Sequence, residues 1–214
     1  DVKKAHCIFE YIYFARLDSK IDNISVYEAR IRGGATLAKT YPVDADLVCG
    51  VPDSGLASAK GYSEESGIPF GLAFHKNSYV GRTFIKPTQK ERESSVKIKL
   101  SVLESVVKGK RIVLVDDSIV RGTTISNLIT MLRKAGATEV HVRISSPPFL
   151  YPCYFGTDVP SNKQLIASSH STEEIRQQIG ADSLGYMPIE ELQNMVGDLP
   201  ICRACFDSHY PMEV

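Results

Sequence analysis

Short apolar runs alternate with helix-like stretches along the middle of this chain. The apolar runs predict buried strands at 47–51, 69–74, 112–115 and 140–144. Helices are predicted between and around them at 26–40, 55–66, 99–107 and 123–135. Unbroken apolar strands separated by helices indicate a parallel sheet that is covered on both faces. We therefore expect an α/β fold with an open, mostly parallel sheet and helices on both faces.

The two ends of the chain lack this rhythm. The first 23 residues are aromatic-rich and irregular, and the alternation from Ile8 to Phe14 predicts a strand there. Beyond residue 146, helices are expected at 171–179 and 188–196. The expected organisation is an N-terminal segment (1–23), a core (24–146) and a C-terminal helical extension (147–214).

Composition excludes several classes of protein. The 214 residues are 43% hydrophobic, and 25 Lys and Arg balance 25 Asp and Glu. A nonspecific nucleic-acid binder would carry a basic excess, so we expect no nucleic acid as a partner. Apolar runs are too short to span a membrane, and residues 1–16 do not read as a signal peptide. Together with an odd number of cysteines, this predicts a cytoplasmic protein.

One strand–turn–helix junction carries the clearest chemistry. The strand 112–115 runs directly into Asp116 and Asp117, and Gly122 then precedes Thr123 and Thr124 at the start of a helix. A helix N-terminus beyond the carboxyl end of a parallel strand suits a phosphate group, and a glycine lets the backbone approach it. The two acids suit ribose hydroxyls, Mg²⁺ or both. The glycine-rich motifs of P-loop and dinucleotide-binding proteins do not occur.

This junction, from Arg111 to Thr124, resembles the phosphoribosyl-diphosphate (PRPP) motif of type I phosphoribosyltransferases. The turn from Val51 to Gly55 resembles the pyrophosphate loop of the same family. The resemblance implies Mg²⁺ bound at Ser54, Asp116 and Asp117. It implies PRPP contacts from Asp53, Ser54, Gly55, Asp116, Asp117, Ser118, Arg121, Gly122, Thr123 and Thr124.

Further segments narrow the family. They occur in the order Cys7–Arg16, Tyr79–Ile85, the PRPP motif, His141–Pro148 and Gly180–Tyr186, and together they resemble the glutamine PRPP amidotransferases. That resemblance implies the first committed step of purine synthesis, in which PRPP and ammonia form 5-phosphoribosylamine. It also implies a glutaminase domain N-terminal to this half, homo-oligomers, and purine nucleotides of the AMP and GMP type as inhibitors. We assign no residue as general acid or base.

The polar stretch 76–98 is long for a loop in a compact domain. A solvated charged loop would explain its composition. The resemblance instead implies a mobile lid that closes over PRPP and keeps water from the reacting carbon. The cations expected to reach the substrate from it are Lys76, Arg82 and Lys86.

Four of the five cysteines form a candidate metal set. Cys202 and Cys205 make a C-x-x-C pair, whereas Cys49 lies inside a predicted buried strand. With Cys7 and Cys153, the pair supplies four thiolates, which suits either Zn²⁺ or a [4Fe–4S] cluster. The resemblance to the Bacillus type of amidotransferase implies the iron–sulfur cluster, with a structural role distant from the phosphate site.

Two other functions compete with the transferase. A non-enzymatic sensor of PRPP or purine nucleotides could share the fold, but as a repressor it would need a DNA-binding module and a basic surface. A phosphoribosyltransferase of base salvage is disfavoured by the four cysteines and the C-terminal extension.

Overall fold

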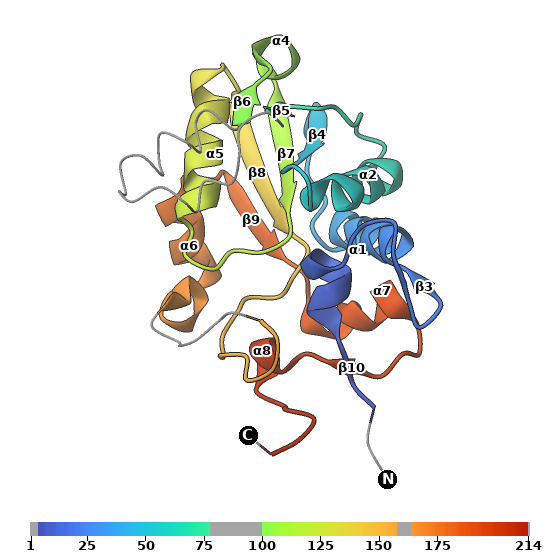
Figure 1. Ribbon diagram of the computed structural model, residues 1–214. Coiled ribbons are helices and arrows are strands. Elements are labelled where there is room, and N and C mark those ends of the chain that lie inside the picture. The colour runs from blue at the N-terminus through green and yellow to red at the C-terminus, as the bar shows by residue number, and fades with distance from the viewer. Residues whose placement is uncertain (1–3, 78–99, 158–163, 214) are drawn as a thin grey trace.

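The computed structural model describes residues 4–77, 100–157 and 164–213. Its centre is a sheet in the order β4-β7-β8-β9, and all neighbouring strands in it are parallel (Figure 1). The strands are β4 (Leu47–Gly50), β7 (Arg111–Asp116), β8 (Glu139–Ile144) and β9 (Ser183–Tyr186). The expected α/β fold with a mostly parallel sheet is confirmed.

Helices cover both faces of this sheet. On one side lie α1 (Val26–Thr40) and α2 (Gly55–Ser66), and on the other lie α5 (Thr123–Lys134) and α6 (Thr172–Ile179) (Figure 1). Along β7, Val113 and Val115 belong to the core beside α1, whereas Ile112 and Leu114 belong to the core beside α5. Successive side chains of a strand point to opposite faces, so a strand buried on both faces needs an unbroken apolar run.

Helices α1 and α2 pack with their backbones in direct contact. A Cβ added to Gly34 would lie 1.8 Å from the carbonyl oxygen of Ser58. One added to Gly61 would lie 2.0 Å from that of Ile31. Glycine lowers helix propensity, but at these two positions it permits the close packing that joins the helices.

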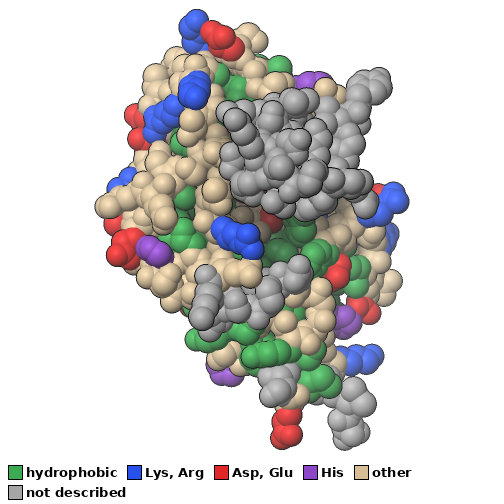
Figure 2. Space-filling view, turned by 60° about the vertical axis from the view of Figure 1, so that its left-hand side comes forward, with side chains coloured by type: hydrophobic (Ala, Val, Ile, Leu, Met, Phe, Trp, Pro, Cys, Tyr) green, Lys and Arg blue, Asp and Glu red, His purple; other side chains and the backbone are tan. Residues whose placement is uncertain are grey.

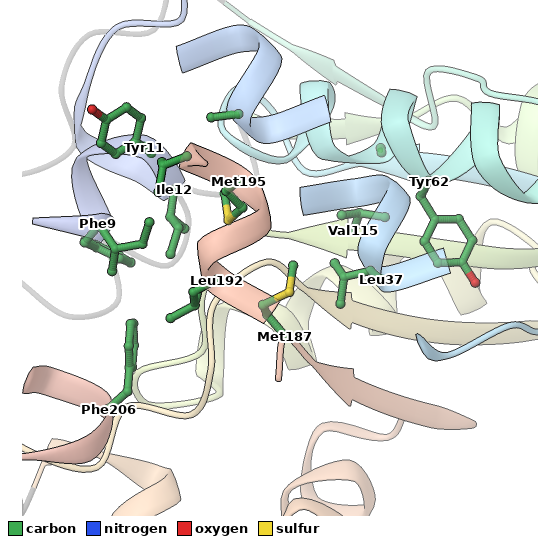
Figure 3. Packing of buried hydrophobic residues seen from close by; sticks show 14 of the residues in the cluster. Phe9, Tyr11, Ile12, Leu37, Tyr62, Val115, Met187, Leu192, Met195 and Phe206 are labelled. Atoms are coloured by element: carbon green, nitrogen blue, oxygen red, sulfur yellow. The ribbon is translucent and has the colours of Figure 1, made fainter. Parts of the chain in front are cut away.

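The N-terminal segment packs against the C-terminal part of the chain. Figure 3 shows Phe9 and Ile12 of this segment near Leu192 and Met195, with Phe206 below them. The strand expected over Ile8–Phe14 is wrong, because Glu10–Phe14 form a single π-helical turn, η1. The buried positions Ile8, Phe9, Tyr11 and Ile12 are nearly consecutive, which suits one face of a helical turn and not an alternating strand.

Three further elements differ from expectation. Instead of a helix over 99–107, β6 (Leu100–Val102) pairs antiparallel with β5 (Phe74–Lys76), and the short helix α4 (Glu104–Val107) follows. Of the strand expected at 69–74, the structure has one bridge between Phe70 and Val48, and Phe74 begins β5. The helix expected at 188–196 is a 3₁₀ turn, η5 (Ile189–Leu192), followed by α7 (Gln193–Val196). Short apolar runs fit helix and strand alike, so pairing partners decided the first two cases.

The C-terminal part does more than add helices. Its strand β9 completes the main sheet, and β10 (Ile201–Cys202) pairs in parallel with β1 (His6–Cys7). The remaining elements are the hairpin of β2 (Lys20–Ile21) and β3 (Ile24–Ser25), the 3₁₀ turn η4 (Ile166–Ser168) and α8 (Ala204–Asp207). Among the described residues, no helix is both long and apolar enough to cross a membrane.

Candidate functional site

The carboxyl ends of β4 and β7 are neighbours at one edge of the sheet, and a cavity of about 910 Å³ opens beside them. Because β4 and β7 are parallel and paired, the loops that follow them reach the same place. Most of the expected substrate residues line this cavity: Ser54, Asp116, Asp117, Ser118, Arg121, Gly122, Thr123 and Thr124.

A network of hydrogen bonds fixes the acid pair at the end of β7. The hydroxyl of Ser54 donates to Oδ1 of Asp117 over 2.5 Å, and that of Ser118 donates to Oδ2 over 2.6 Å. The backbone N–H of Asp117 donates to Oδ1 of Asp116 over 2.9 Å. Both acids are buried, with 7% of Asp116 and 9% of Asp117 exposed, so their orientation is set by these contacts and not by solvent.

Without a cation, ionisation of both carboxyl groups of the acid pair is unfavourable. Burial raises the pKa of Asp116 well above its ordinary value, and the neighbouring carboxylate of Asp117 raises it further. A divalent cation would relieve both effects, since it favours the charged form of each carboxyl group. The donor set of two carboxylates and the Ser54 hydroxyl is all oxygen, as Mg²⁺ prefers. These residues therefore fit Mg²⁺.

The turn before α5 forms the other side of the cavity. Gly122 has a φ of 79°, a left-handed conformation that favours glycine. Its carbonyl oxygen accepts the N–H of Ser126 over 3.0 Å, which starts the helix. Thr123 and Thr124 are exposed in the first turn, where backbone N–H groups are free of helical partners. The arrangement can bind an anion at the positive end of the helix dipole.

Some expected substrate residues lie apart from this cavity. Lys76 of β5 forms an ion pair with Asp53, and neither residue is among those lining the cavity. Gly55 serves packing, since a Cβ there would lie 2.4 Å from the carbonyl oxygen of Val115. Arg82 and Lys86 fall outside the described residues, as does the expected lid from residue 78 onward.

An aromatic wall closes the cavity on the side of the N-terminal segment. It consists of Phe9, Tyr13, Phe14 and Phe149. The Phe9 ring lies 5.1 Å from the rings of both Phe14 and Phe149, in edge-on contacts. Sequence reasoning placed no part of the site here, although the density of aromatic residues in the first 23 positions was a signal.

Arg30 of α1 holds this wall in place. Its guanidinium donates to the carbonyl oxygens of Tyr11, Tyr13 and Ala15, each over 2.9 Å. Arg30 is only 4% exposed. Burial lowers the pKa of Arg30, while the charge of Asp117 raises it. A buried cation held by three carbonyl groups fixes the π-helical turn, and with it the aromatic residues that face the cavity.

The four candidate ligand cysteines line a second cavity, of about 320 Å³. Cys7 and Cys202 are paired across β1 and β10, while Cys153 and Cys205 come from a loop and from α8. All five cysteines of the chain are free thiols. Cys49 is fully buried in β4, where burial raises the pKa of its thiol to about 12, so it is separate from this group as expected.

Backbone N–H groups donate hydrogen bonds to the sulfur of Cys153, which favours its thiolate form. The N–H groups of Phe155 and Thr157 each donate to its Sγ over 3.4 Å. Burial raises the pKa of the Cys153 thiol, but these hydrogen bonds outweigh it and leave the pKa below its ordinary value. Among the described residues, no three His, Cys, Asp or Glu side chains are arranged to hold a single metal ion. The thiols thus share one cavity without converging on one point.

The two cavities share part of their walls, because Phe14 and Thr157 line both. The cysteine cavity therefore adjoins the large cavity along these two residues, although the cysteines themselves do not line the large cavity. The π-helical turn causes this, since it carries Phe14 back between the two cavities only seven residues after Cys7.

Charged side chains of both signs are interspersed on the face of the molecule in Figure 2. On the face in Figure 2, Lys and Arg alternate with Asp and Glu, and the described atoms show no continuous basic patch. This agrees with the zero net charge of the sequence.

Comparison with known proteins gives consistent results. A family model described as "Phosphoribosyl transferase domain" matches residues 22–145. The amidophosphoribosyltransferase of Methanocaldococcus jannaschii is 56% identical over 98% of this chain and 45% of its own length. That of Bacillus subtilis is 53% identical over 100% of this chain and 46% of its own length. The chain thus spans less than half the length of these relatives.

Solved structures agree with the sequence comparison. The B. subtilis glutamine PRPP amidotransferase in complex with ADP and GMP superposes with a TM-score of 0.90 at 52% identity. It covers 100% of this chain and 48% of the solved chain. The four-stranded sheet and the loops at its carboxyl edge thus recur in a protein with two bound nucleotides.

Proposed function

Because the chain belongs to the phosphoribosyl transferase domain family and matches the phosphoribosyltransferase portion of amidophosphoribosyltransferases, we propose that it transfers the phosphoribosyl group of PRPP to ammonia. The products are 5-phosphoribosylamine and pyrophosphate, and the reaction is the first committed step of purine synthesis. The observation that carries the proposal is the buried pair Asp116 and Asp117, held by Ser54 in one cavity with the Gly122 turn.

The chain's own residues bind and orient PRPP. Free N–H groups at the start of α5, with the hydroxyls of Thr123 and Thr124, hold the 5′-phosphate. The carboxylates of Asp116 and Asp117 accept hydrogen bonds from the ribose hydroxyls. Asp116, Asp117 and Ser54 would hold Mg²⁺, which when bound neutralises charge on the diphosphate leaving group.

The chemistry needs positioning more than proton transfer. Ammonia attacks C1 of the ribose with its lone pair, the bond from C1 to the diphosphate oxygen breaks, and pyrophosphate leaves with that electron pair. The nitrogen then loses one proton to solvent. The aromatic wall of Phe9, Tyr13, Phe14 and Phe149 restricts water beside the cavity, which protects the oxocarbenium-like state from hydrolysis. Arg82 and Lys86 remain proposed lid residues.

The cysteine cavity fits an iron–sulfur cluster better than zinc. A tetrahedral zinc site brings four thiolates to about 3.8 Å from one another, as follows from Zn–S bonds of about 2.3 Å. In a [4Fe–4S] cluster each thiolate binds its own iron, so the four sulfur atoms lie farther apart than they do around one zinc ion. The four thiols that line this one cavity supply the four ligands that such a cluster requires, which supports the proposal. Cys7, Cys153, Cys202 and Cys205 would hold it, and it would tie three distant segments together.

The wider assembly is proposed by likeness to the longer relatives. An ammonia-producing glutaminase domain and a homo-oligomer would complete the enzyme, and purine nucleotides would inhibit it at the PRPP cavity. The B. subtilis structure with ADP and GMP supports nucleotide binding. The free state of all five cysteines supports a reducing compartment such as the cytoplasm.

One assay separates the enzyme from a ligand sensor of the same fold. The chain is incubated with PRPP, Mg²⁺ and ammonium, or with glutamine in place of ammonium, and pyrophosphate and phosphoribosylamine are measured. We expect product with ammonium and none with glutamine. Binding of PRPP without product would favour the sensor, and glutamate released from glutamine would contradict the assignment of this half.

A further inference from the structure

A segment far along the chain reaches the phosphate turn. Arg121, which directly precedes Gly122, donates through Nη2 to Oε1 of Gln164. Both side chains line the large cavity. The residues are 43 positions apart, and the backbone between their segments includes all of α5 and β8. Tertiary structure alone therefore creates this contact.

The backbone of the same segment supports the turn. The N–H of Ile166 donates to the carbonyl oxygen of Val120 over 2.8 Å. The side chain of Ile166 lies directly under the turn, since a Cβ added to Gly122 would meet its Cδ1 at 3.1 Å. Ile166 is buried, with 8% exposed. These contacts of Ile166 hold the segment Gln164–Ile166 against the turn, and so they fix the backbone position of Gln164.

Among the described residues, only Gln164 forms a hydrogen bond with the Arg121 side chain. This side chain is exposed, and an exposed arginine samples many rotamers. Within the described ranges, the hydrogen bond to Gln164 is the contact that selects a rotamer directed along the cavity wall. An amide oxygen accepts from the guanidinium and leaves its positive charge in place for an anion.

We propose that Gln164 is a positioning residue of the phosphate site, which holds the Arg121 guanidinium ready for the 5′-phosphate of PRPP. The proposal rests on the function proposed above for this cavity. Gln164 acts through Arg121 and does not touch the reacting carbon. Its loss should therefore weaken PRPP binding and leave the chemical step unchanged.

The test uses five variants of this chain with saturating ammonium and Mg²⁺. Gln164→Met keeps the length of the side chain but removes the acceptor, and Gln164→Glu retains an acceptor at the same reach. Arg121→Leu and the double variant complete a cycle. Gln177→Met, on the exposed side of α6 where Gln177 contacts Glu173, is the matched control.

We expect Gln164→Met to raise the KM for PRPP three- to tenfold with kcat within twofold of wild type. Gln164→Glu keeps the acceptor but adds a negative charge that offsets the guanidinium, so its KM should lie between those of wild type and Gln164→Met, and Gln177→Met should match wild type. Arg121→Leu should raise KM as well, and adding Gln164→Met should change it no further. An unchanged KM in Gln164→Met, or effects of the two substitutions that add fully, would overturn the proposal. So would a fall in thermal midpoint that accompanies the rise in KM.

Calorimetry with ribose 5-phosphate tests the role of Gln164 separately from the proposed transferase function. If wild type binds this probe but forms no phosphoribosylamine, the transferase function fails while the Gln164 comparison still applies to binding. If wild type and Gln164→Met bind it equally, the positioning role fails alone. If wild type binds neither PRPP nor ribose 5-phosphate, both proposals fail.

Discussion

The hydroxyl of Ser54 donates to Oδ1 of Asp117 over 2.5 Å and so joins loops whose residues are 63 positions apart. One loop follows β4 and the other follows β7, and the two strands are paired in parallel. In the proposed function, diphosphate and ribose are held by these two loops at one place. This contact sets the distance between those loops before any ligand arrives.

The acid pair should control PRPP binding that depends on Mg²⁺. Replacing Asp116 and Asp117 together with Asn keeps their size and removes their charge. We expect the affinity for PRPP in the presence of Mg²⁺ to fall at least tenfold, about 1.4 kcal/mol, by calorimetry. Asp18→Asn, which alters an exposed pair with Arg16, is the control and should bind as wild type does. Equal affinity in the double variant would remove the acids from the site.

Alanine substitutions at the two neighbouring glycines of α1, Gly33 and Gly34, should differ sharply in their effect on stability. Gly34→Ala would place a methyl group against the backbone of Ser58, which cannot move without separating α1 from α2. We expect it to lower the free energy of unfolding by about 3 kcal/mol. Gly33→Ala meets only the flexible end of Met195, at 3.2 Å, so it should change stability by less than about 1 kcal/mol. Urea denaturation measures both, and similar losses would contradict the packing argument.

Arg30 should matter for folding out of proportion to its single charge. Arg30→Met leaves the carbonyl oxygens of Tyr11, Tyr13 and Ala15 without this donor. The bond to Tyr11 is buried, whereas those to Tyr13 and Ala15 are partly buried. A buried group left without its partner costs about 1–3 kcal/mol, so we expect a loss of about 2 kcal/mol in urea denaturation. Arg16→Met removes an exposed ion pair and should leave the midpoint of urea denaturation close to that of wild type. A loss for Arg30→Met no larger than this control would refute the anchoring role.

The iron content of the protein should depend on the four cysteines that line the second cavity. Protein purified without oxygen should hold about four irons per chain, and Cys153→Ser should lose them. Cys49→Ser is the control, because Cys49 lies in β4, and it should keep its iron. Since Phe14 and Thr157 line both cavities, the iron-free variant should also bind PRPP more weakly by calorimetry. One zinc per chain, or iron lost from Cys49→Ser alone, would overturn the ligand assignment.

One surface ion pair predicts a specific dependence on pH. Hydrogen bonds from the side chain and backbone of Arg111 lower the pKa of Asp46 from 3.8 to about 2. A carboxyl group whose pKa is depressed in the folded state contributes stability above its unfolded pKa and loses it as pH falls through the folded one. Between pH 4 and pH 2, the stability advantage of wild type over Asp46→Asn should therefore shrink toward zero. Midpoints of urea denaturation across this range provide the measurement, and a constant difference would count against the ion pair.

The sequence predicted the fold where local and global signals agree. The apolar runs of β4, β7 and β8 lie between strong helix signals, and all three strands form as expected. The acid pair and the Gly122 turn were predictable because the whole strand–turn–helix unit is contiguous in the chain. Residues 99–107 were misassigned because nine residues fit either structure until β5 supplies a pairing partner.

The parts of the site that escaped prediction come from distant segments. Gln164 carries no local signal, since a glutamine in an irregular stretch is ordinary until the fold places Arg121 beside it. The aromatic wall depends on a π-helical turn, a conformation without a sequence signature of its own, and on Arg30 from another element. Contacts between distant segments decide such features, and periodicity does not report them.

The strand β9 makes the C-terminal part indispensable for solubility. It pairs with β8 from Ser183 to Tyr186, although the family match ends at residue 145. A chain cut at that boundary would leave β8 as an edge strand with unpaired N–H and C=O groups. Its apolar residues Val140, Val142 and Ile144 would lose part of their cover. Such edges pair with other chains, so we expect residues 22–145 of this chain to aggregate if they are expressed alone.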